Sequence, residues 1–171
     1  CSSDLQAHGA KINGKPVGSF GHMAAFSFCQ DKIISTMGEG GLVATDNEEW
    51  FKKAWAYKDH GKGYDTVYKK QHPPGFRWLH DSFGSNYRMT EAQAAVGRIQ
   101  LRKLPEWQKL RARNAGILNE AFQGIAGVRL SLSPAHITHA YYRFYLFVAK
   151  NRDRIMAEIN AQGIRCQVGI C

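Results

Sequence analysis

Lys32 is the side chain of this sequence that is best suited to covalent chemistry. It ends the segment 26–32 (FSFCQDK), and the glycine-rich stretch 36–41 (TMGEGG) follows it. A lysine amine forms a Schiff base with a carbonyl only when it is neutral, and partial burial on a rigid loop disfavours the ammonium form. Taken alone, a loop lysine is typical of a solvated surface, so the surrounding pattern has to decide.

Two short strands are expected to hold this loop. Residues 24–28 and 41–45 are apolar and rich in aromatic, small or β-branched side chains, which is typical of buried strands. Asp46 then caps a predicted helix that runs to about His60, with Glu49 at the third helical position. A strand, a loop, a strand and a helix in this order indicate α/β architecture.

Turn and helix signals organise the rest of the chain. Asn13-Gly14 predicts a tight two-residue turn, and the glycine-, proline- and aromatic-rich residues 61–86 predict a long, substrate-facing loop. Thr90 caps a long helix with Gln93 in the box position, and Pro105 predicts a break or kink. Further predicted elements are a second helix to about Phe122, a strand over 141–148, a helix over 153–162 and a strand over 164–168.

Four motifs occur in a specific order around Lys32. They are residues 6–10 (QAHGA), 18–21 (GSFG), 27–41 and 84–95 (GSNYRMTEAQAA). In order and approximate spacing they resemble the DegT/DnrJ/EryC1/StrS family of pyridoxal-phosphate enzymes, mostly aminotransferases that act on nucleotide-linked keto sugars. The resemblance implies a fold type I aminotransferase-like α/β fold. It also implies a division into residues 1–104, the later part of a cofactor-binding large domain, and 105–171, a connecting helix and the start of a small α+β domain.

The resemblance implies a role for several individual positions. Lys32 matches the lysine that carries pyridoxal phosphate as a Schiff base and later moves a proton as general base and acid. Ser27 matches a ligand of the cofactor phosphate, and Gln6 matches a glutamine beside the cofactor ring. Asn86 matches an asparagine that reaches the phosphate in the neighbouring subunit, which makes a homodimer part of the expected site.

The family pattern is not complete at the N-terminal end. An aspartate three residues before the motif glutamine usually pairs with the pyridinium nitrogen of the cofactor, and here that position is Ser3. Either Asp4 takes this role through a local shift, or the first residues are a foreign junction, or the function has been lost. The segments that supply the front half of the family site would precede Cys1, so we expect the chain alone to bind cofactor weakly and to turn over poorly.

Other residues have a structural explanation beside a functional one. Arg88 either binds phosphate or pairs with Glu91 and braces the helix start, and the glycines of residues 36–41 let the backbone turn near the cofactor. No nucleophile motif accompanies the histidines, which lie in the first motif or in and beside the long loop. These histidines are His8, His60, His72 and His80.

Composition excludes several classes of protein. With 171 residues, 44% hydrophobic and 22% charged, the chain is typical of a globular domain. It lacks both a stretch of roughly 18 apolar residues and a secretion signal, so we expect a cytoplasmic protein with no membrane partner. Its four cysteines include no C-x-x-C pair, so free thiols are expected and no metal. The net charge of +9 favours an anionic partner but does not choose among nucleic acid, an acidic surface and a phosphorylated small molecule. The lysines and arginines form no basic block, which is typical of a solvated face, so no nucleic-acid partner is expected.

Together these observations favour transfer of an amino group, with glutamate as the expected donor, to a keto carbon of a nucleotide-linked sugar. Family members that dehydrate their substrate replace the lysine by histidine, and this chain has Lys32. Two other hypotheses remain. One is a non-catalytic fragment or interaction protein that keeps the aminotransferase fold, and the other is a basic nucleic-acid-binding protein.

Overall fold

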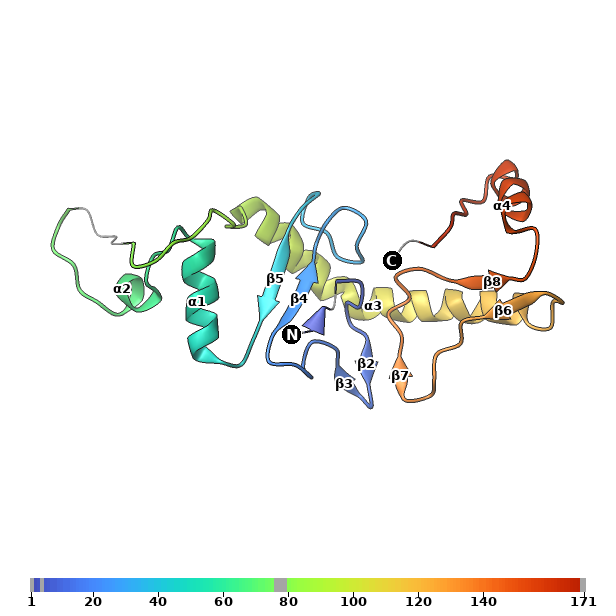
Figure 1. Ribbon diagram of the computed structural model, residues 1–171, viewed down its shortest axis with the longest axis horizontal. Helices are drawn as coiled ribbons and strands as arrows, with labels where there is room; N and C mark the ends of the chain where they lie inside the picture. Colours follow the sequence, from blue (N-terminus) through green and yellow to red (C-terminus); the bar gives the residue numbers. More distant parts are fainter. Residues whose placement is uncertain (1, 4, 76–79, 170–171) are drawn as a thin grey trace.

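The computed structural model describes residues 2–3, 5–75 and 80–169. Figure 1 shows its layout: the long helix α3 (Glu91–Phe122) runs lengthwise behind β4 (Ala24–Ser27) and β5 (Gly41–Ala44) and on towards β6 (Val128–Leu130). Helices α1 (Glu48–Lys58) and α2 (Tyr64–Tyr68) lie at one end, and α4 (Arg152–Ala161) lies at the other. Asp4 and residues 76–79 of the predicted long loop lie outside the described residues.

The predicted strands around Lys32 are confirmed. β1 (Ser2–Ser3) pairs in parallel with β4, and β4 pairs antiparallel with β5, so that Ser27 faces Gly41 at the end of the ladder. The intervening residues 28–40 therefore form a loop that leaves and rejoins the same end of the sheet. This loop carries Lys32.

The two strands are buried to different extents, and only Ala24 of β4 is fully buried. In β4, Ala24 is 1% exposed, whereas Leu42 and Val43 of β5 are 47% and 55% exposed. The prediction that both strands are buried is wrong for β5. This strand is at the edge of its three-stranded sheet, and within the described residues no layer covers these two side chains.

Local turn and capping signals are mostly confirmed. Asn13 and Gly14 have φ of +50° and +76° and join β2 (Lys11–Ile12) to β3 (Lys15–Pro16), as a two-residue hairpin with positive φ at both positions requires. At α1 the predicted cap is wrong by one residue. The side chain of Asn47, not that of Asp46, accepts the hydrogen bond from Trp50 N at 2.9 Å. The Thr45 hydroxyl in turn accepts from Asn47 N at 3.1 Å.

Helix α3 begins as predicted but does not break at Pro105. Thr90 and Gln93 form both bonds of the capping box, and the helix continues for 32 residues through the proline. Pro105 removes one backbone donor. Leu104 and Trp107, on either side of it, pack against the buried core, and this contact holds the helix together across the lost bond.

The C-terminal region contains less strand than predicted. Residues 141–145 are irregular, because Tyr141 is left-handed with φ +47°, and only β8 (Leu146–Val148) pairs, with β6. The strand expected over 164–168 does not form. The backbone groups of Cys166, which a strand would use to pair with its neighbour, bond to the Asn160 side chain instead. Cys166 N donates to it at 3.0 Å, and Cys166 O accepts from it at 2.8 Å. The predicted helix is confirmed as α4, and Gly163 follows it with φ +82°.

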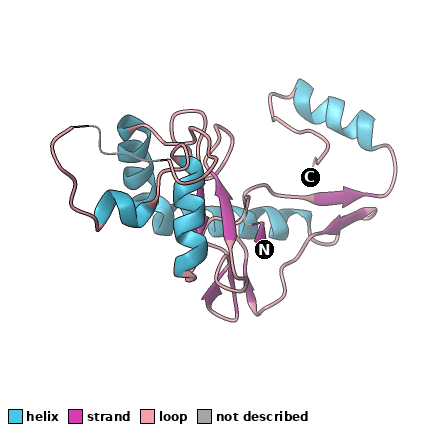
Figure 2. Ribbon diagram, turned by 60° about the vertical axis from the view of Figure 1, so that its left-hand side comes forward, coloured by secondary structure: helices cyan, strands magenta, loops and turns pink. Residues whose placement is uncertain are grey.

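The buried core lies beside the Lys32 loop. Ala10, Ile33 and Ala140 are between 4% and 8% exposed and bring together three segments that are distant in sequence. β7 (Ile137–Thr138) pairs with β2 next to this core, and a second view of the same arrangement is given in Figure 2. Because Ile33 directly follows Lys32, packing of this core fixes the middle of the loop 28–40. Among the described residues, no helix is both long and apolar enough to cross a membrane.

Candidate active site around Lys32

The Lys32 side chain is largely enclosed. It is 12% exposed, and its Nζ lies 3.4 Å from Asp31 Oδ1 and 5.1 Å from the centre of the Tyr142 ring. The loop is fixed on both sides, since Lys32 N donates to Cys29 O at 3.1 Å and Thr36 N donates to Phe28 O at 3.0 Å. The sequence therefore placed this lysine correctly on a rigid, partly buried loop.

Ser27 and the glycine turn lie on the same structural unit. The Ser27 hydroxyl stands at the end of β4 and accepts a long bond of 3.4 Å from Cys29 N. Thr36, 1% exposed, donates its hydroxyl to Glu39 O at 2.8 Å. A Cβ built on Gly40 would lie 2.1 Å from Thr36 Oγ1, so close packing requires a glycine there.

Three site residues were not found from the sequence. The Tyr142 hydroxyl donates a short hydrogen bond to Asp31 Oδ2, and Arg143 Nη2 lies 3.6 Å from the same oxygen. The sequence separation between Asp31 and Tyr142 is 111 residues, and no local spacing rule spans such a distance. The apolar setting of Tyr142 in the sequence suggests only a strand.

The electrostatics of Lys32 differ from the expectation. Desolvation is the largest single influence on the pKa of Lys32 and lowers it, but the bond to Asp31 and the surrounding negative charge raise the pKa overall. The pKa of Asp31 is held far below its usual value by hydrogen bonds from Cys29 and Tyr142. In this structure the ammonium form of Lys32 is therefore favoured, because these contacts outweigh the effect of burial that the sequence predicted.

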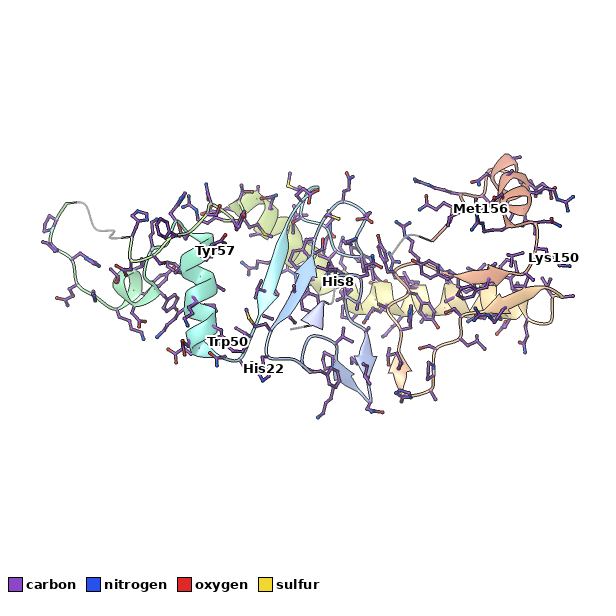
Figure 3. The ribbon with its side chains drawn as sticks, viewed as in Figure 1. His8, His22, Trp50, Tyr57, Lys150 and Met156 are labelled. Carbon is purple, nitrogen blue, oxygen red and sulfur yellow. The ribbon has the colours of Figure 1, made fainter. Side chains whose placement is uncertain are left out.

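His8 lies buried beneath the end of β4 (Figure 3). It is 4% exposed, and its ring centre lies 5.8 Å from that of Phe26 and 5.7 Å from that of Phe28, the two residues that flank Ser27. Burial lowers the pKa of His8, a contact with the Ser27 backbone opposes this in part, and the charge of Lys32 lowers the pKa further. His8 is thus a neutral packing residue that supports the phosphate-binding candidate Ser27.

This burial predicts a pH dependence of stability that originates at His8. Because its folded pKa is lowered, its contribution is fully present above the unfolded pKa and is lost as pH falls below it. Between pH 7.5 and 5.5 the wild type should lose up to about 1.4 kcal/mol relative to His8→Leu. Urea denaturation of both proteins at each pH measures the difference. A constant gap between the two would contradict a buried neutral His8.

Asn86 is held beside the end of α1. It forms a β-bridge with Asp59 beyond the end of α1, and its Oδ1 accepts from Arg88 Nε at 3.1 Å. Arg88 Nε also lies 3.5 Å from Asp59 Oδ1. Arg88 therefore braces the segment around Asn86, where the sequence had suggested pairing with Glu91.

The remaining candidates are dispersed. Gln6 is exposed at the turn before β2, and the Asp4 prediction lies outside the described residues. In the long loop, His80 Nδ1 lies 2.6 Å from His60 O and His72 Nε2 lies 2.7 Å from Thr66 O. Both rings therefore hydrogen-bond to backbone carbonyl groups. Cys29 and Cys166 are free thiols, and the described residues contain no group of three or more side chains arranged to hold a metal.

The sequence comparison decides the family. The sequence model of the DegT/DnrJ/EryC1/StrS aminotransferase family matches residues 4–169. The chain belongs to this aminotransferase family. One relative is the UDP-N-acetyl-3-dehydro-alpha-D-glucosamine 3-aminotransferase of Acidithiobacillus ferrooxidans, 33% identical over 159 residues, which make up 93% of this chain and 39% of the relative.

Solved structures share the fold of this chain. The aminotransferase from Psychrobacter cryohalolentis superposes with a TM-score of 0.86 and 48% identity over 94% of this chain and 45% of its own. DesV of S. venezuelae, solved in complex with a ketimine intermediate, superposes with a TM-score of 0.81 and 28% identity over 95% of this chain and 40% of its own. The fold is thus the α/β fold type I of these aminotransferases. The chain spans about two fifths of the length of the relatives it matches.

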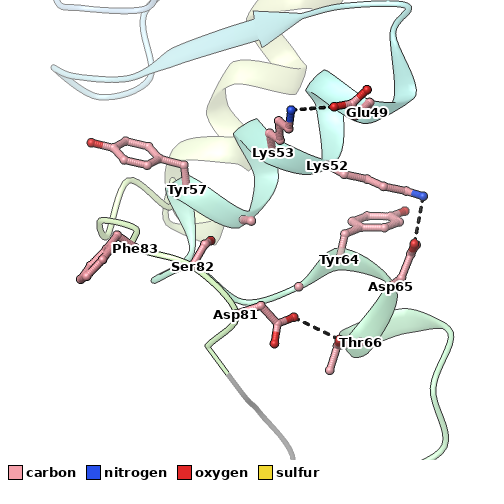
Figure 4. Close-up of a pocket in the computed structure, with 12 residues that line it drawn as sticks. Glu49, Lys52, Lys53, Tyr57, Tyr64, Asp65, Thr66, Asp81, Ser82 and Phe83 are labelled. Atoms are coloured by element: carbon pink, nitrogen blue, oxygen red, sulfur yellow. Dashed lines mark hydrogen bonds and ion pairs between the residues drawn. The ribbon is translucent and has the colours of Figure 1, made fainter.

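One cavity lies away from Lys32. Its volume is about 430 Å³, and Figure 4 shows it between α1, α2 and residues 81–83. Its lysines are already paired, Lys52 with Asp65 at 3.0 Å and Lys53 with Glu49 at 2.6 Å. Chemistry, not cavity size, therefore places the candidate active site of this family member at Lys32.

Proposed function

We propose that the chain functions as a pyridoxal-phosphate-dependent aminotransferase that acts on a nucleotide-linked keto sugar, with glutamate as the amino donor. The observation that carries this proposal is Lys32 itself. Its side chain is 12% exposed and lies on the loop 28–40 that follows β4, in a chain that belongs to an aminotransferase family. An amine in that position is chemically suited to hold an aldehyde covalently.

The residues present fit the cofactor. In the described part of the chain the Ser27 hydroxyl accepts from Cys29 N and has no acceptor for its own hydrogen, so that hydrogen is available to a phosphate oxygen. When bound, pyridoxal phosphate supplies an electron sink for the substrate carbon. Lys32 Nζ would take a proton at that carbon and return one, and Gln6 would lie beside the ring. Asp4 is proposed as the partner of the pyridinium nitrogen.

The substrate class follows from chemistry and from the relatives. The enzyme from Acidithiobacillus ferrooxidans is by its name an aminotransferase of a UDP-linked sugar. A formal net charge of +9 suits both a phosphorylated cofactor and a substrate that carries a diphosphate. We also propose that residues 1–104 and 105–171 act as two domains, with α3 passing through the boundary as one helix.

A direct assay tests this function. The chain is incubated with pyridoxal phosphate, glutamate and a UDP-linked 3-keto sugar, and both 2-oxoglutarate and amino sugar are measured. One 2-oxoglutarate per amino sugar is expected. Absence of both products, together with no borohydride-trapped cofactor mass on Lys32, would favour the non-catalytic alternative.

A homodimer is proposed as part of the site, with Asn86 reaching the neighbouring chain. Tyr57 and Tyr87 beside Asn86 are 54% and 68% exposed, and their ring centres lie 6.0 Å apart. An exposed aromatic pair of this kind is a common feature of protein contact surfaces. It supports a contact that would carry Asn86 to a second copy.

Mixing two defective variants tests the shared site. Lys32→Ala and Asn86→Ala are each expected to lose trapped cofactor. If Lys32 and Asn86 of one site come from different chains, a refolded equimolar mixture contains hybrid dimers and should regain about a quarter of the sites. Mass spectrometry of the trapped cofactor measures the recovery. No recovery in a mixture that sediments as a dimer would show that each chain supplies both residues.

A further inference from the structure

The Asp31 carboxylate collects contacts from two segments of the chain. From its own loop, Cys29 Sγ donates to Oδ1 at 2.7 Å and Lys32 Nζ lies 3.4 Å from the same atom. From residues 141–143, the Tyr142 hydroxyl donates to Oδ2 and Arg143 Nη2 lies 3.6 Å away. Oδ1 of Asp31 is thus contacted by its own loop, and Oδ2 is contacted by residues 141–143.

The second segment is anchored independently of Asp31. Arg111 of α3 donates to Tyr141 O at 2.9 Å and to Tyr142 O at 3.4 Å. The Tyr142 ring also packs against the core that contains Ile33. The hydroxyl of Tyr142 is therefore held at a fixed place, and it fixes the carboxylate it contacts.

Lys32 is confined between these groups. Its Nζ lies 5.1 Å from the centre of the Tyr142 ring, and the Arg143 guanidinium carbon lies 4.8 Å from the centre of the same ring. Charged and titratable groups that face Lys32 come from three places: Asp31 and Cys29 on its own loop, Tyr142 and Arg143 on residues 141–143, and His8 in the turn before β2.

We propose that Asp31 is a positioning residue that acts on Lys32: the Tyr142–Asp31 pair holds the amine in its ammonium form, and a carbonyl ligand has to compete with that ion pair. This inference rests on the proposed function, because it concerns the amine that would carry the cofactor. The physical reason is simple. A nearby carboxylate stabilises the charged amine, and only the neutral amine attacks a carbonyl.

The test measures Lys32 without any cofactor. The full chain is labelled briefly with acetic anhydride at a series of pH values, and the acetylated fraction of Lys32 is read by peptide mass spectrometry. In Asp31→Asn the pH midpoint should fall by roughly half a unit, which gives about three times more neutral amine below the midpoint. Tyr142→Phe keeps the ring but releases the carboxylate, so a smaller shift in the same direction is expected.

Two further variants separate position from charge. Asp31→Glu keeps the carboxylate and should keep the high midpoint. Asp153→Asn, which removes the exposed partner of Arg152 at 2.7 Å, should leave Lys32 unchanged. A purely structural role for Asp31 would not move the midpoint. If neither Asp31→Asn nor Tyr142→Phe moves it, the inference is overturned.

Cofactor trapping distinguishes this inference from the proposed function. At neutral pH and equal pyridoxal phosphate, borohydride should fix more cofactor on Lys32 in Asp31→Asn than in the wild type. Trapped cofactor with an unchanged acetylation midpoint would reject the inference and keep the function. A shifted midpoint with no trapped cofactor in any variant would reject the function and keep the electrostatic role of Asp31.

Discussion

Replacing Lys32 by alanine is expected to abolish borohydride-stable attachment of pyridoxal phosphate at residue 32 and to lower turnover about 10²-fold or more. Alanine has no nucleophile, and its methyl group cannot move a proton. Lys32→Arg should fail as well, since a guanidinium keeps the charge but stays protonated. Intact-mass and peptide mass spectrometry after borohydride reduction measure the attachment.

A matched control shows that position, not lysine chemistry in general, is responsible. Lys53, whose side chain is 72% exposed and paired with Glu49, can be replaced by alanine with no expected loss of trapped cofactor. If Lys32→Ala retained the cofactor mass seen in the wild type, the amine of the active site would have to be a different one.

Gly61→Ala is expected to cost about 3 kcal/mol or more of unfolding free energy, because two penalties add. Gly61 has φ +77°, and an added Cβ would lie 1.7 Å from the Ser82 backbone oxygen. Backbone cannot rotate away as a flexible side chain can. The contact also matters for the site, since the Gly61 carbonyl accepts from Asp81 N at 2.9 Å and so ties down the segment that leads to Asn86.

Gly14→Ala is the control for this prediction. Gly14 has nearly the same φ, +76°, but an added Cβ there meets nothing within 4 Å. Only the conformational penalty of roughly 1–2 kcal/mol should remain. Urea denaturation of the two variants isolates the steric part as the difference. Equal losses of unfolding free energy would mean that the close contact between the added Cβ of residue 61 and the Ser82 oxygen is relieved at no cost.

Local sequence patterns predicted local structure well wherever neighbouring residues decide it. The Asn13-Gly14 turn, the Thr90–Gln93 capping box and the strand that precedes Lys32 all follow from interactions within a few residues. The errors have the same origin. Pro105 carries a local signal for a break, but packing of its neighbours against the core overrides it.

The sequence by itself determined that Lys32 stands on a glycine-flanked loop after a strand, within an ordered set of motifs typical of one aminotransferase family. The tertiary structure decided what surrounds the amine. Asp31, Tyr142 and Arg143 meet only because the chain returns along α3 after 111 residues. The bond to Asp31, together with Tyr142 and Cys29, outweighs the effect of burial on the pKa of Lys32. Hydrogen bonds and charges act through space, so the protonation of Lys32 depends on the distant Tyr142 as well as on its sequence neighbours Asp31 and Cys29.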